Sequence, residues 1–431
     1  EQEIRQLTDE IVRSLSGIRP RMDEPAARPA TPSYPATGGW LWETADQAVA
    51  AAKAAQARLV ELTLEKRGEL IAAMRKTAIA QAEHLARMAH EETGYGHVAH
   101  KLEKNLLVAR RTPGIEDLVT TAHTGDLGMM LEERAPFGVV GSITPSTNPT
   151  STVINNAISI IAGGNAVVFN PHPAAKRCSQ ETMRLLNEAI VAAGGPDALI
   201  ATVRKPTMET GQAIMLHSDI PLLSITGGEA VVQVAMKTGK KVIAAGPGNP
   251  PVIVDETADI AAAGRDIVDG ASFDNNIMCI CEKEVFAVSQ ITDRLMDEMV
   301  KHGAWRISGQ DIERVMAITL KPQGNKHVVN RQYVGKNAAD ILRDAGVAFQ
   351  GNPRLIIAEV SDNHPFVLVE MLMPVLPVVR VRDIDAAIEG AFRAEQGCSH
   401  SAMIHSTNIH NMSRAAKRMN TTIFVKNAPC Y

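Results

Sequence analysis

The segment SFDNNIMCICEKEVF (272–286) contains the residue type best suited to covalent chemistry, a cysteine beside a turn. Cys279 follows an Asn-rich stretch and precedes a short β-branched and aromatic run, so we expect it in a loop before a strand. A cysteine nucleophile needs thiolate character and access, and a loop position favours both. Without further information, a cysteine in such a segment is more often buried and inert. Cys281, two residues further on, is expected to serve packing.

Two other polar residues stand at positions that chemistry could use. Asn148 lies between Thr147 and Pro149, where an Asn is usually a turn former. Glu370 precedes a long apolar run and, by itself, would be a surface glutamate at a strand end. No G-x-G-x-x-G follows the first expected strand, so any bound nucleotide must be held in another way.

The cysteine pattern predicts neither a disulfide framework nor a metal site. The five cysteines are odd in number and irregularly spaced, at Cys178, Cys279, Cys281, Cys398 and Cys430. In a chain this long the pattern favours a reducing cytoplasm. Cys279 and Cys281 are two residues apart, and no nearby Cys or His completes a tetrahedral set of ligands, so no bound metal is expected.

Composition excludes several classes of function. The 431 residues carry a formal net charge of −4 with dispersed Lys and Arg, so no nucleic-acid partner is expected. Aromatic residues make up only 3%, which argues against a base-stacking surface. No apolar run reaches membrane-spanning length, so no membrane partner is expected. The length itself predicts two or three domains.

The elements that must position these residues are two series of short apolar strands separated by helical stretches. Such an alternation is typical of doubly wound α/β sheets. The first series comprises residues 138–143, 166–170, 222–227, 241–246 and 251–256. The second comprises residues 284–288, 354–360, 375–381, 401–406 and 421–426. Residues 44–95 are Ala-rich with helical spacing of Leu, Ile and Met, and predict two or three helices.

The first twenty residues have a different character. Residues 1–20 predict a short amphipathic helix, and residues 21–39 are a Pro-rich linker. A tethered helix cannot bury its own apolar stripe, so it docks either on its parent domain or on a partner as a targeting helix.

Six blocks together resemble the aldehyde dehydrogenase superfamily, and more narrowly the CoA-acylating propionaldehyde and acetaldehyde dehydrogenases of bacterial microcompartments. The resemblance runs from about Glu43 to the last residue, in the family's order. The blocks are residues 134–173, 224–228, 244–255, 272–279, 369–379 and 396–406. The resemblance implies an aldehyde dehydrogenase-like fold with two doubly wound α/β domains and a small bridging β element. Residues 40–252 would form the cofactor-binding domain, with the bridging element at about 125–142, and residues 253–431 the catalytic domain.

The resemblance assigns roles to residues of both domains. Cys279 matches the family nucleophile, and Asn148 the asparagine that donates to the thiohemiacetal oxyanion. Glu370 matches the glutamate that holds the nicotinamide ribose of NAD. The remaining cofactor-binding positions are the turn Thr226, Gly227 and Gly228 under the pyrophosphate, and the segment Asn170, Pro171 and His172, where hydrolytic relatives carry a ribose-binding lysine.

Ala245 is the decisive departure from hydrolytic relatives, which carry a water-activating glutamate there. Without a general base a thioester hydrolyses slowly and persists until a better nucleophile, a thiol, arrives. The resemblance therefore implies coenzyme A as the acyl acceptor and a reversible reaction. His400 could help deprotonate the incoming thiol, although a structural role is the simpler interpretation.

The expected function is NAD-dependent oxidation of a short-chain aldehyde, propanal or acetaldehyde, to an acyl-CoA. The alternatives are a hydrolytic enzyme that releases free acid and an inactive relative that acts as a shell-associated scaffold. The subfamily also implies that residues 1–20 are an encapsulation peptide that binds a microcompartment shell, which would place the enzyme in the cytoplasm, within the microcompartment lumen. Family members continue past the block that ends at Tyr431 with an oligomerisation strand, so the full-length protein is expected to be a homo-oligomer. The choice between NAD and NADP stays open.

Overall fold

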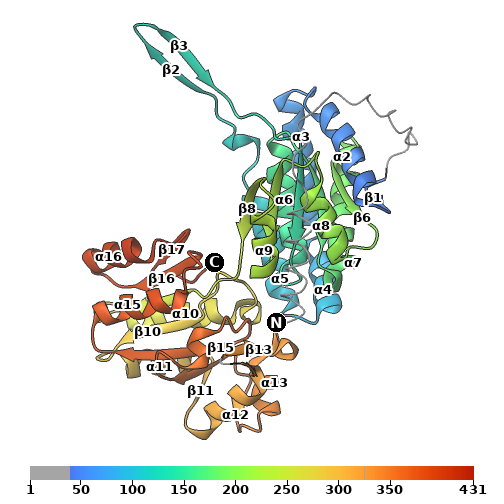
Figure 1. The fold of residues 1–431 in the computed structure, drawn as a ribbon. Coiled ribbons are helices and arrows are strands. Elements are labelled where there is room, and N and C mark those ends of the chain that lie inside the picture. Colours follow the sequence, from blue (N-terminus) through green and yellow to red (C-terminus); the bar gives the residue numbers. More distant parts are fainter. Residues whose placement is uncertain (1–38, 325) are drawn as a thin grey trace. The chain divides into compact units, whose positions relative to one another are not determined.

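Two parallel β-sheets organise residues 39–324 and 326–431, which the computed structural model describes (Figure 1). One unit comprises the described residues up to Glu92 together with Leu102–Ala245, and the other comprises Thr93–Lys101 and Gly246–Tyr431. The expected α/β class with two doubly wound domains is confirmed. The predicted N-terminal helix (1–20) and all of the predicted linker except Gly39 lie outside the described residues.

The first unit contains a six-stranded sheet in which every neighbouring pair is parallel. In spatial order its strands are β1 (Leu41–Trp42), β6 (Ile200–Val203), β5 (Ala166–Pro171), β4 (Val139–Thr144), β7 (Leu222–Thr226) and β8 (Lys241–Ala245). The chain runs from β4 outward through β5 to β6 and then crosses to β7 and β8. Strand order therefore reverses between β4 and β7, where open α/β sheets bind their ligands, beyond the carboxyl ends of the strands.

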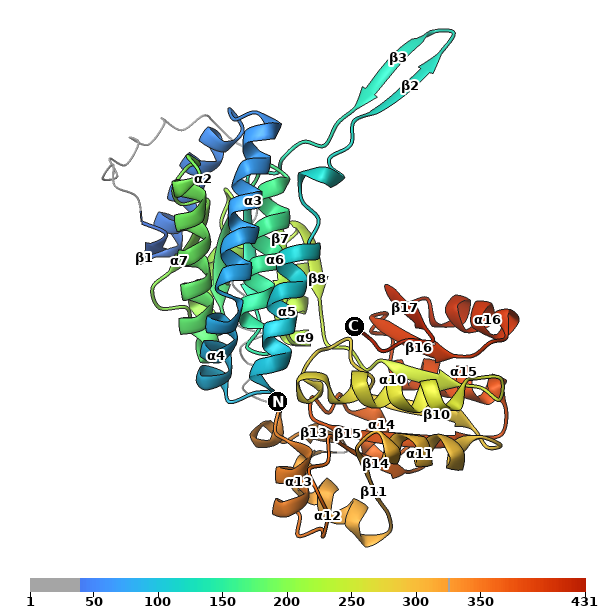
Figure 2. The ribbon, with the colours of Figure 1, turned by 180° about the vertical axis from the view of Figure 1, so that it is seen from behind.

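Helices cover both faces of this sheet, which explains why its central strands are almost wholly buried. Helices α3, α6 and α7 pack on one face, and α2 and α8 on the other (Figure 2). The helices of this unit are α2 (Ala45–Leu59), α3 (Leu64–Ala80), α4 (Ala82–Thr93), α5 (Val98–Arg111), α6 (Pro149–Ala162), α7 (Lys176–Ala192), α8 (Met208–Leu216) and α9 (Glu229–Met236), except that the last residue of α4 and the part of α5 up to Lys101 belong to the other unit. Two or three helices were predicted within residues 44–95, and three are present, α2, α3 and α4.

An antiparallel hairpin of β2 (Thr121–Gly125) and β3 (Gly128–Glu132) projects from the first unit. Every residue of both strands is exposed. The predicted bridging element, at about 125–142, differs from this hairpin because residues 139–142 are the first part of the central strand β4.

The second unit contains a seven-stranded sheet, again with every neighbouring pair parallel. Its strands in spatial order are β11 (Ala304–Ile307), β14 (Leu355–Glu359), β15 (Val375–Val381), β10 (Glu284–Val288), β9 (Pro251–Val254), β16 (Ser401–His405) and β17 (Ile423–Lys426). The unit begins at Gly246, not at 253 as predicted. The reason is that β9 pairs with β10 and β16 of this sheet.

The helices of the second unit bury apolar stripes on both faces of its sheet. One core cluster lies under α10 and α11, and another under α15 and α16. The helices are α10 (Ile260–Ser272), α11 (Thr292–Lys301), α12 (Gln310–Thr319), α13 (Ala338–Asp344), α14 (Pro365–Leu368), α15 (Ile384–Glu395) and α16 (Ile409–Met419), and a separate hairpin joins β12 (Leu320–Gln323) to β13 (Lys326–Val329). Among the described residues, no helix combines the length and apolar composition that crossing a bilayer requires.

Candidate active site

Cys279 lies, as predicted, in the loop between α10 and β10, and it is partly exposed. The three residues Asp274, Asn275 and Asn276 that begin this loop all have left-handed backbones, with φ of 48°, 55° and 62°. Among residues with a side chain, Asn and Asp tolerate this conformation best. The Asp-Asn-Asn run before Cys279 therefore supplies the residue types that best adopt the left-handed conformation of this turn.

Asp274 is fully buried and anchors the beginning of the turn. Its carboxylate accepts hydrogen bonds from the His97 backbone N–H at 2.8 Å and from Lys101 Nζ at 3.0 Å. Its own backbone N–H donates to Nδ1 of His100 at 2.8 Å. Gly96 is required beside it, because a Cβ on Gly96 would lie 1.9 Å from Asp274 Oδ1.

Asn275 and Asn276 are buried as well and use their side-chain amides to hold the turn. Asn275 Nδ2 donates to the carbonyl oxygen of Gly335 at 2.9 Å. Asn276 Nδ2 donates to the carbonyl oxygens of Ala271 at 2.8 Å and Glu282 at 2.9 Å. The turn is thus tied both to the end of α10 and to the beginning of the following strand.

Lys283 is the central support of the Cys279 loop. Its side chain is only 1% exposed, and its ammonium donates to the carbonyl oxygens of Asn276 at 2.8 Å and Met278 at 3.0 Å, and to Asn276 Oδ1. A buried cation is stable only when its donors are paired. Here all three acceptors are neutral and belong to the loop that leads to Cys279.

The carboxyl groups on either side of Lys283 are also buried. Burial raises the pKa of Glu282 to about 7 and raises the pKa of Glu284 well above its usual value. Both oxygens of Glu284 lack a hydrogen-bond partner among the described residues, so no hydrogen bond offsets the cost of burying its charged form. Ligand atoms of Cys281, Glu282 and Cys430 lie within 4.8 Å of one another in this buried region. These three residues are one fewer than the four ligands of a structural zinc site. Cys281 packs in the hydrophobic core, as predicted.

The Cys279 thiol is protonated near neutral pH. Burial, and to a lesser extent the Glu370 carboxylate, raise its pKa to about 11 against the opposing effect of the Lys283 ammonium. Because the thiolate is the nucleophilic form, reaction requires this proton to leave.

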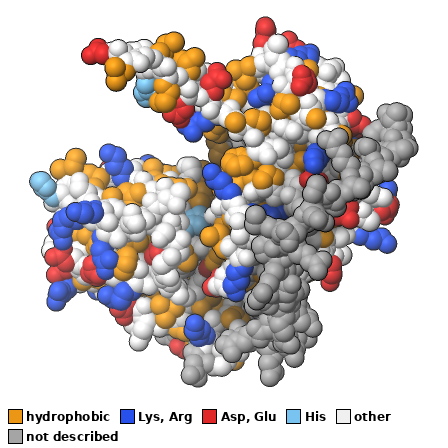
Figure 3. Space-filling view, turned by 45° about the horizontal axis from the view of Figure 1, so that its top comes forward, with side chains coloured by type: hydrophobic (Ala, Val, Ile, Leu, Met, Phe, Trp, Pro, Cys, Tyr) orange, Lys and Arg blue, Asp and Glu red, His pale blue; other side chains and the backbone are white. Residues whose placement is uncertain are grey.

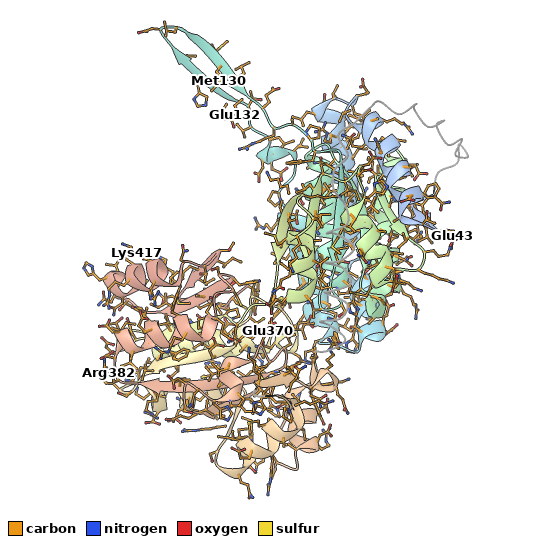
Figure 4. All side chains as sticks on the ribbon, viewed as in Figure 1. Glu43, Met130, Glu132, Glu370, Arg382 and Lys417 are labelled. Carbon is orange, nitrogen blue, oxygen red and sulfur yellow. The ribbon has the colours of Figure 1, made fainter. Side chains whose placement is uncertain are left out.

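Gly248 brings the backbone close to Cys279. A Cβ on Gly248 would lie 2.6 Å from the Cys279 carbonyl oxygen and 2.9 Å from Cγ of His400. The backbone N–H of Gly248 donates to Oε1 of Glu370 at 3.3 Å. Gly248 therefore joins Cys279, His400 and Glu370 into one group within the second unit, where Figure 4 labels Glu370.

His400 is held on both sides. Its backbone N–H donates to Glu395 at 3.0 Å, and its Nδ1 shares a hydrogen bond of 2.8 Å with Ser401 Oγ. Burial and then the Lys283 ammonium lower its pKa, so the imidazole is neutral at pH 7. A neutral imidazole with Nδ1 engaged can accept a proton at Nε2.

In the first unit, the predicted residues gather at the carboxyl ends of β4, β5 and β7. Asn148 follows β4 as the N-cap residue of α6, and Thr226 ends β7, the strand beside β4. Gly227 and Gly228 lead into α9, and a Cβ on Gly228 would meet nothing within 4 Å. The turn is therefore open where the resemblance places a pyrophosphate.

The segment after β5 is only partly suited to bind a cofactor. Asn170 is buried, and its amide is engaged by α8: Nδ2 donates to the Thr207 carbonyl oxygen at 3.2 Å, and Oδ1 accepts from Thr210 at 2.7 Å. Pro171 is buried at the end of β5, whereas His172 is exposed. Of the three predicted residues, only His172 presents its side chain to solvent.

Two lysines, one in each unit, had no counterpart among the predicted residues. Lys283 stands between two glutamates, a pattern typical of a solvated surface, yet all three side chains are buried. Lys104 is 8% exposed, and its Nζ donates to Asn148 Oδ1 at 2.7 Å. Neither lysine belongs to a recognisable motif, so only the fold reveals them.

The chain is similar to known proteins over nearly all the described residues. The sequence model of the aldehyde dehydrogenase family matches residues 42–430. An acetylating acetaldehyde dehydrogenase of Bilophila wadsworthia is 50% identical over 397 residues, 90% of this chain and 82% of that protein. A propionaldehyde dehydrogenase from the fucose utilisation bacterial microcompartment of Clostridium phytofermentans superposes with a TM-score of 0.88 at 47% identity, covering 91% of this chain and 89% of that one.

A third similar protein was solved with its ligand. The propionaldehyde dehydrogenase of Rhodopseudomonas palustris with bound propionyl-CoA superposes with a TM-score of 0.88 at 44% identity, covering 91% of this chain and 87% of that one. A further structure of that enzyme carries CoA and an acylated cysteine.

Proposed function

This chain belongs to the aldehyde dehydrogenase family, and we propose that, as one of the family's CoA-acylating enzymes, it oxidises a two- or three-carbon aldehyde with NAD and passes the acyl group to coenzyme A. Cys279 is the nucleophile. Its thiolate adds to the aldehyde carbon and forms a thiohemiacetal whose oxygen carries the negative charge. The Asn148 amide donates a hydrogen bond to that oxygen. When the oxyanion collapses, the carbon loses a hydride and Cys279 is left as a thioester.

NAD accepts that hydride when it is bound. The residues present fit such a cofactor, because the open Gly227–Gly228 turn stands at the beginning of α9 and at the point where strand order reverses. We assign Thr226, Gly227 and Gly228 to the pyrophosphate, Glu370 to the nicotinamide ribose, and His172 to the adenosine side. The Asn170 amide is already engaged by α8, so we assign it to the support of this edge. NAD is proposed over NADP because the site shows no charged group assigned to a ribose phosphate.

Ala245 is the observation that carries the choice of coenzyme A over water. This residue ends β8 opposite Thr226, and its methyl group cannot act as a base. The thioester therefore persists until a thiol attacks it, because a thiol reacts far faster than water near neutral pH. His400 is neutral and lies beside Gly248 and Cys279, so it can take the proton of the incoming thiol. Because a thioester retains its acyl-transfer potential, the enzyme also reduces acyl-CoA.

The test is NADH formation by the enzyme with NAD and propanal, with and without coenzyme A. We expect steady NADH production only with coenzyme A, and at most one NADH per active site without it. Cys279→Ala should abolish both, whereas Cys281→Ala should retain both. Steady NADH production without coenzyme A would identify a hydrolytic enzyme, and Glu370, whose charge reaches Cys279, would then be the candidate base. No NADH under any condition would favour the inactive scaffold.

Propanal and acetaldehyde are both substrates of the similar relatives, and we propose propanal as the preferred one. A comparison of kcat/KM for the two aldehydes decides between them. No single residue of the site carries this choice; it follows from the likeness to the propionaldehyde enzymes.

We propose that the β2–β3 hairpin joins copies of this chain into a homo-oligomer. The hairpin exposes Leu127, Met129, Met130 and Leu131, each by more than half of its surface (Figures 3 and 4). A two-stranded hairpin is marginally stable in water without a partner. Sedimentation of the full-length enzyme should show a dimer or tetramer that Met130→Glu weakens.

We also propose that residues 1–20 form an encapsulation peptide that binds the shell of a microcompartment. The amphipathic pattern of these residues and the microcompartment origin of a similar enzyme support this placement. Fusion of residues 1–20 to a fluorescent protein, in cells with and without the shell, tests it.

A further inference from the structure

Asn148 occupies a helix N-cap position but does not cap the helix. It precedes Pro149 at the beginning of α6, with φ −134° and ψ 53°, and its side chain makes no capping hydrogen bond. An Asn at this position usually accepts a hydrogen bond from a backbone N–H of the first turn, and this stabilises the helix by about 1 kcal/mol. The Asn148 side chain gives up that contact for another one.

That other contact is with Lys104 on α5. Lys104 Nζ donates to Asn148 Oδ1 at 2.7 Å, and Lys104 is buried. An ammonium group has donors only, so it fixes which end of the Asn148 amide carries oxygen. Nδ2 must then face away from Lys104. One of its hydrogens is directed to Thr147 Oγ1 at 3.2 Å, which leaves the other for a substrate oxygen.

The neighbouring residue of α5 makes a different hydrogen bond to the same segment. Oδ1 of Asn105 accepts from the Thr150 hydroxyl at 2.8 Å, and Nδ2 of Asn105 donates to the Ala82 carbonyl oxygen at 3.1 Å. Thr150 lies in the first turn of α6, two residues after Asn148. The pair Asn105–Thr150 therefore fixes the helix, whereas the pair Lys104–Asn148 fixes the amide.

We infer that Lys104 is a positioning residue that acts through Asn148: it orients the amide so that an N–H faces the oxyanion, and its positive charge polarises that N–H. This inference rests on the proposed function, in which Asn148 donates to the thiohemiacetal oxygen. A hydrogen bond from an ion to one end of an amide strengthens the donor at the other end. Such an aligned donor is worth most when charge develops on the reacting oxygen, so Lys104 affects the rate of the chemical step more than aldehyde binding.

The test is a double-mutant cycle on the full-length enzyme, measured as the rate of the first NADH burst after rapid mixing with NAD and propanal. Loss of one oxyanion donor commonly slows turnover by roughly 10²–10³-fold, and we expect that loss in Asn148→Ala. Lys104→Met should slow the burst by roughly 10- to 100-fold with little change in the aldehyde KM, and Lys104→Arg should restore part of the loss. The double variant Lys104→Met/Asn148→Ala should be no slower than Asn148→Ala alone.

Thr150→Val is the matched control. It removes the Asn105 hydrogen bond from the same segment and should lower thermal stability with little effect on the burst. In the double variant Thr150→Val/Asn148→Ala, the fold-changes in burst rate of the two single variants should multiply. If Lys104→Met retains the wild-type burst rate, or if its loss multiplies with that of Asn148→Ala, the positioning role is overturned. If Asn148→Ala itself retains the wild-type burst rate, the proposed oxyanion chemistry fails and not the positioning role alone.

Discussion

Replacing Lys283 by methionine should loosen the Cys279 loop and make the thiol less acidic. Methionine keeps the length of the side chain but removes the ammonium that pairs the carbonyl oxygens of Asn276 and Met278 and the side-chain oxygen of Asn276. Each buried acceptor left unpaired costs about 1–3 kcal/mol. Three such acceptors give a destabilisation of roughly 3–9 kcal/mol if the loop does not rearrange, which is a large part of a domain's typical 5–15 kcal/mol.

Lys283→Met should make Cys279 less reactive. The Lys283 ammonium lowers the pKa of Cys279 against burial and Glu370, so its removal raises that pKa above about 11. Below the pKa, each further unit lowers the thiolate fraction tenfold. Alkylation of Cys279 by iodoacetamide should therefore be slower at every pH between 7 and 10, provided that the loop stays closed.

Two measurements separate stability from acidity. Hydrogen exchange of the peptide that spans residues 272–283 reports the free energy of opening, and mass spectrometry of the same peptide reports alkylation against pH. Lys301→Met is the matched control, because this lysine is 66% exposed and forms an ion pair with Glu298, and such surface pairs contribute about 0–1 kcal/mol. Unchanged exchange in Lys283→Met, together with an unchanged alkylation profile, would refute both arguments.

Three further predictions concern Gly248, Glu370 and His400, with Gly228 of the first unit as a contrast to Gly248. Gly248→Ala should lower kcat by roughly 10-fold or more, because a Cβ would lie 2.6 Å from a backbone oxygen, whereas Gly228→Ala should leave the melting temperature unchanged and raise the KM for NAD. Glu370→Gln should raise the KM for NAD and, because this carboxylate raises the pKa of Cys279, shift alkylation to lower pH. His400→Asn should slow coenzyme A-dependent turnover but not the first NADH burst. Because burial lowers the pKa of His400, the wild-type profile of kcat/KM for coenzyme A against pH should stay high below pH 6.5.

The strands that pack on both faces could be predicted from the sequence because each is a short apolar run between turns. β10 was predicted at its observed bounds, and β4, β5 and β7 within one residue of theirs. The sequence was a poorer guide to which of the two sheets each strand joins. Residues 251–256 resemble the preceding strands in composition, yet β9 pairs with β10 and β16 of the other unit. The pairing partner depends on contacts that are distant in sequence, so the predicted domain boundary fell after residue 252.

For the site, the resemblance identified residues that belong to ordered motifs, and it missed those that act from outside them. Cys279 and Glu370, which the resemblance identified, lie together with Gly248 within the second unit. Lys104 and Lys283 are buried cations, and the usual expectation for a lysine in a charged run is exposure. The resemblance also assigns Asn170 to the cofactor; its amide is hydrogen-bonded to Thr207 and Thr210, and its contact with the cofactor stays a prediction.

The position of Cys279 is determined mainly by buried polar contacts, and the energetics of the turn show why. A left-handed residue with a side chain costs roughly 1–2 kcal/mol, somewhat less for Asn and Asp, so Asp274, Asn275 and Asn276 together store a few kcal/mol of strain. Each buried hydrogen bond contributes about 0.5–1.5 kcal/mol, and those to a charged group contribute more. The bonds from His97, Lys101 and Lys283, together with the amide contacts of the two asparagines, are enough to offset the strain. A hydrophobic loop could not do so, because apolar packing is not directional and would let the turn relax towards ordinary φ values. The Asp-Asn-Asn run therefore places the nucleophile without touching the substrate, and substitutions there should displace Cys279 before they unfold the sheet beneath it.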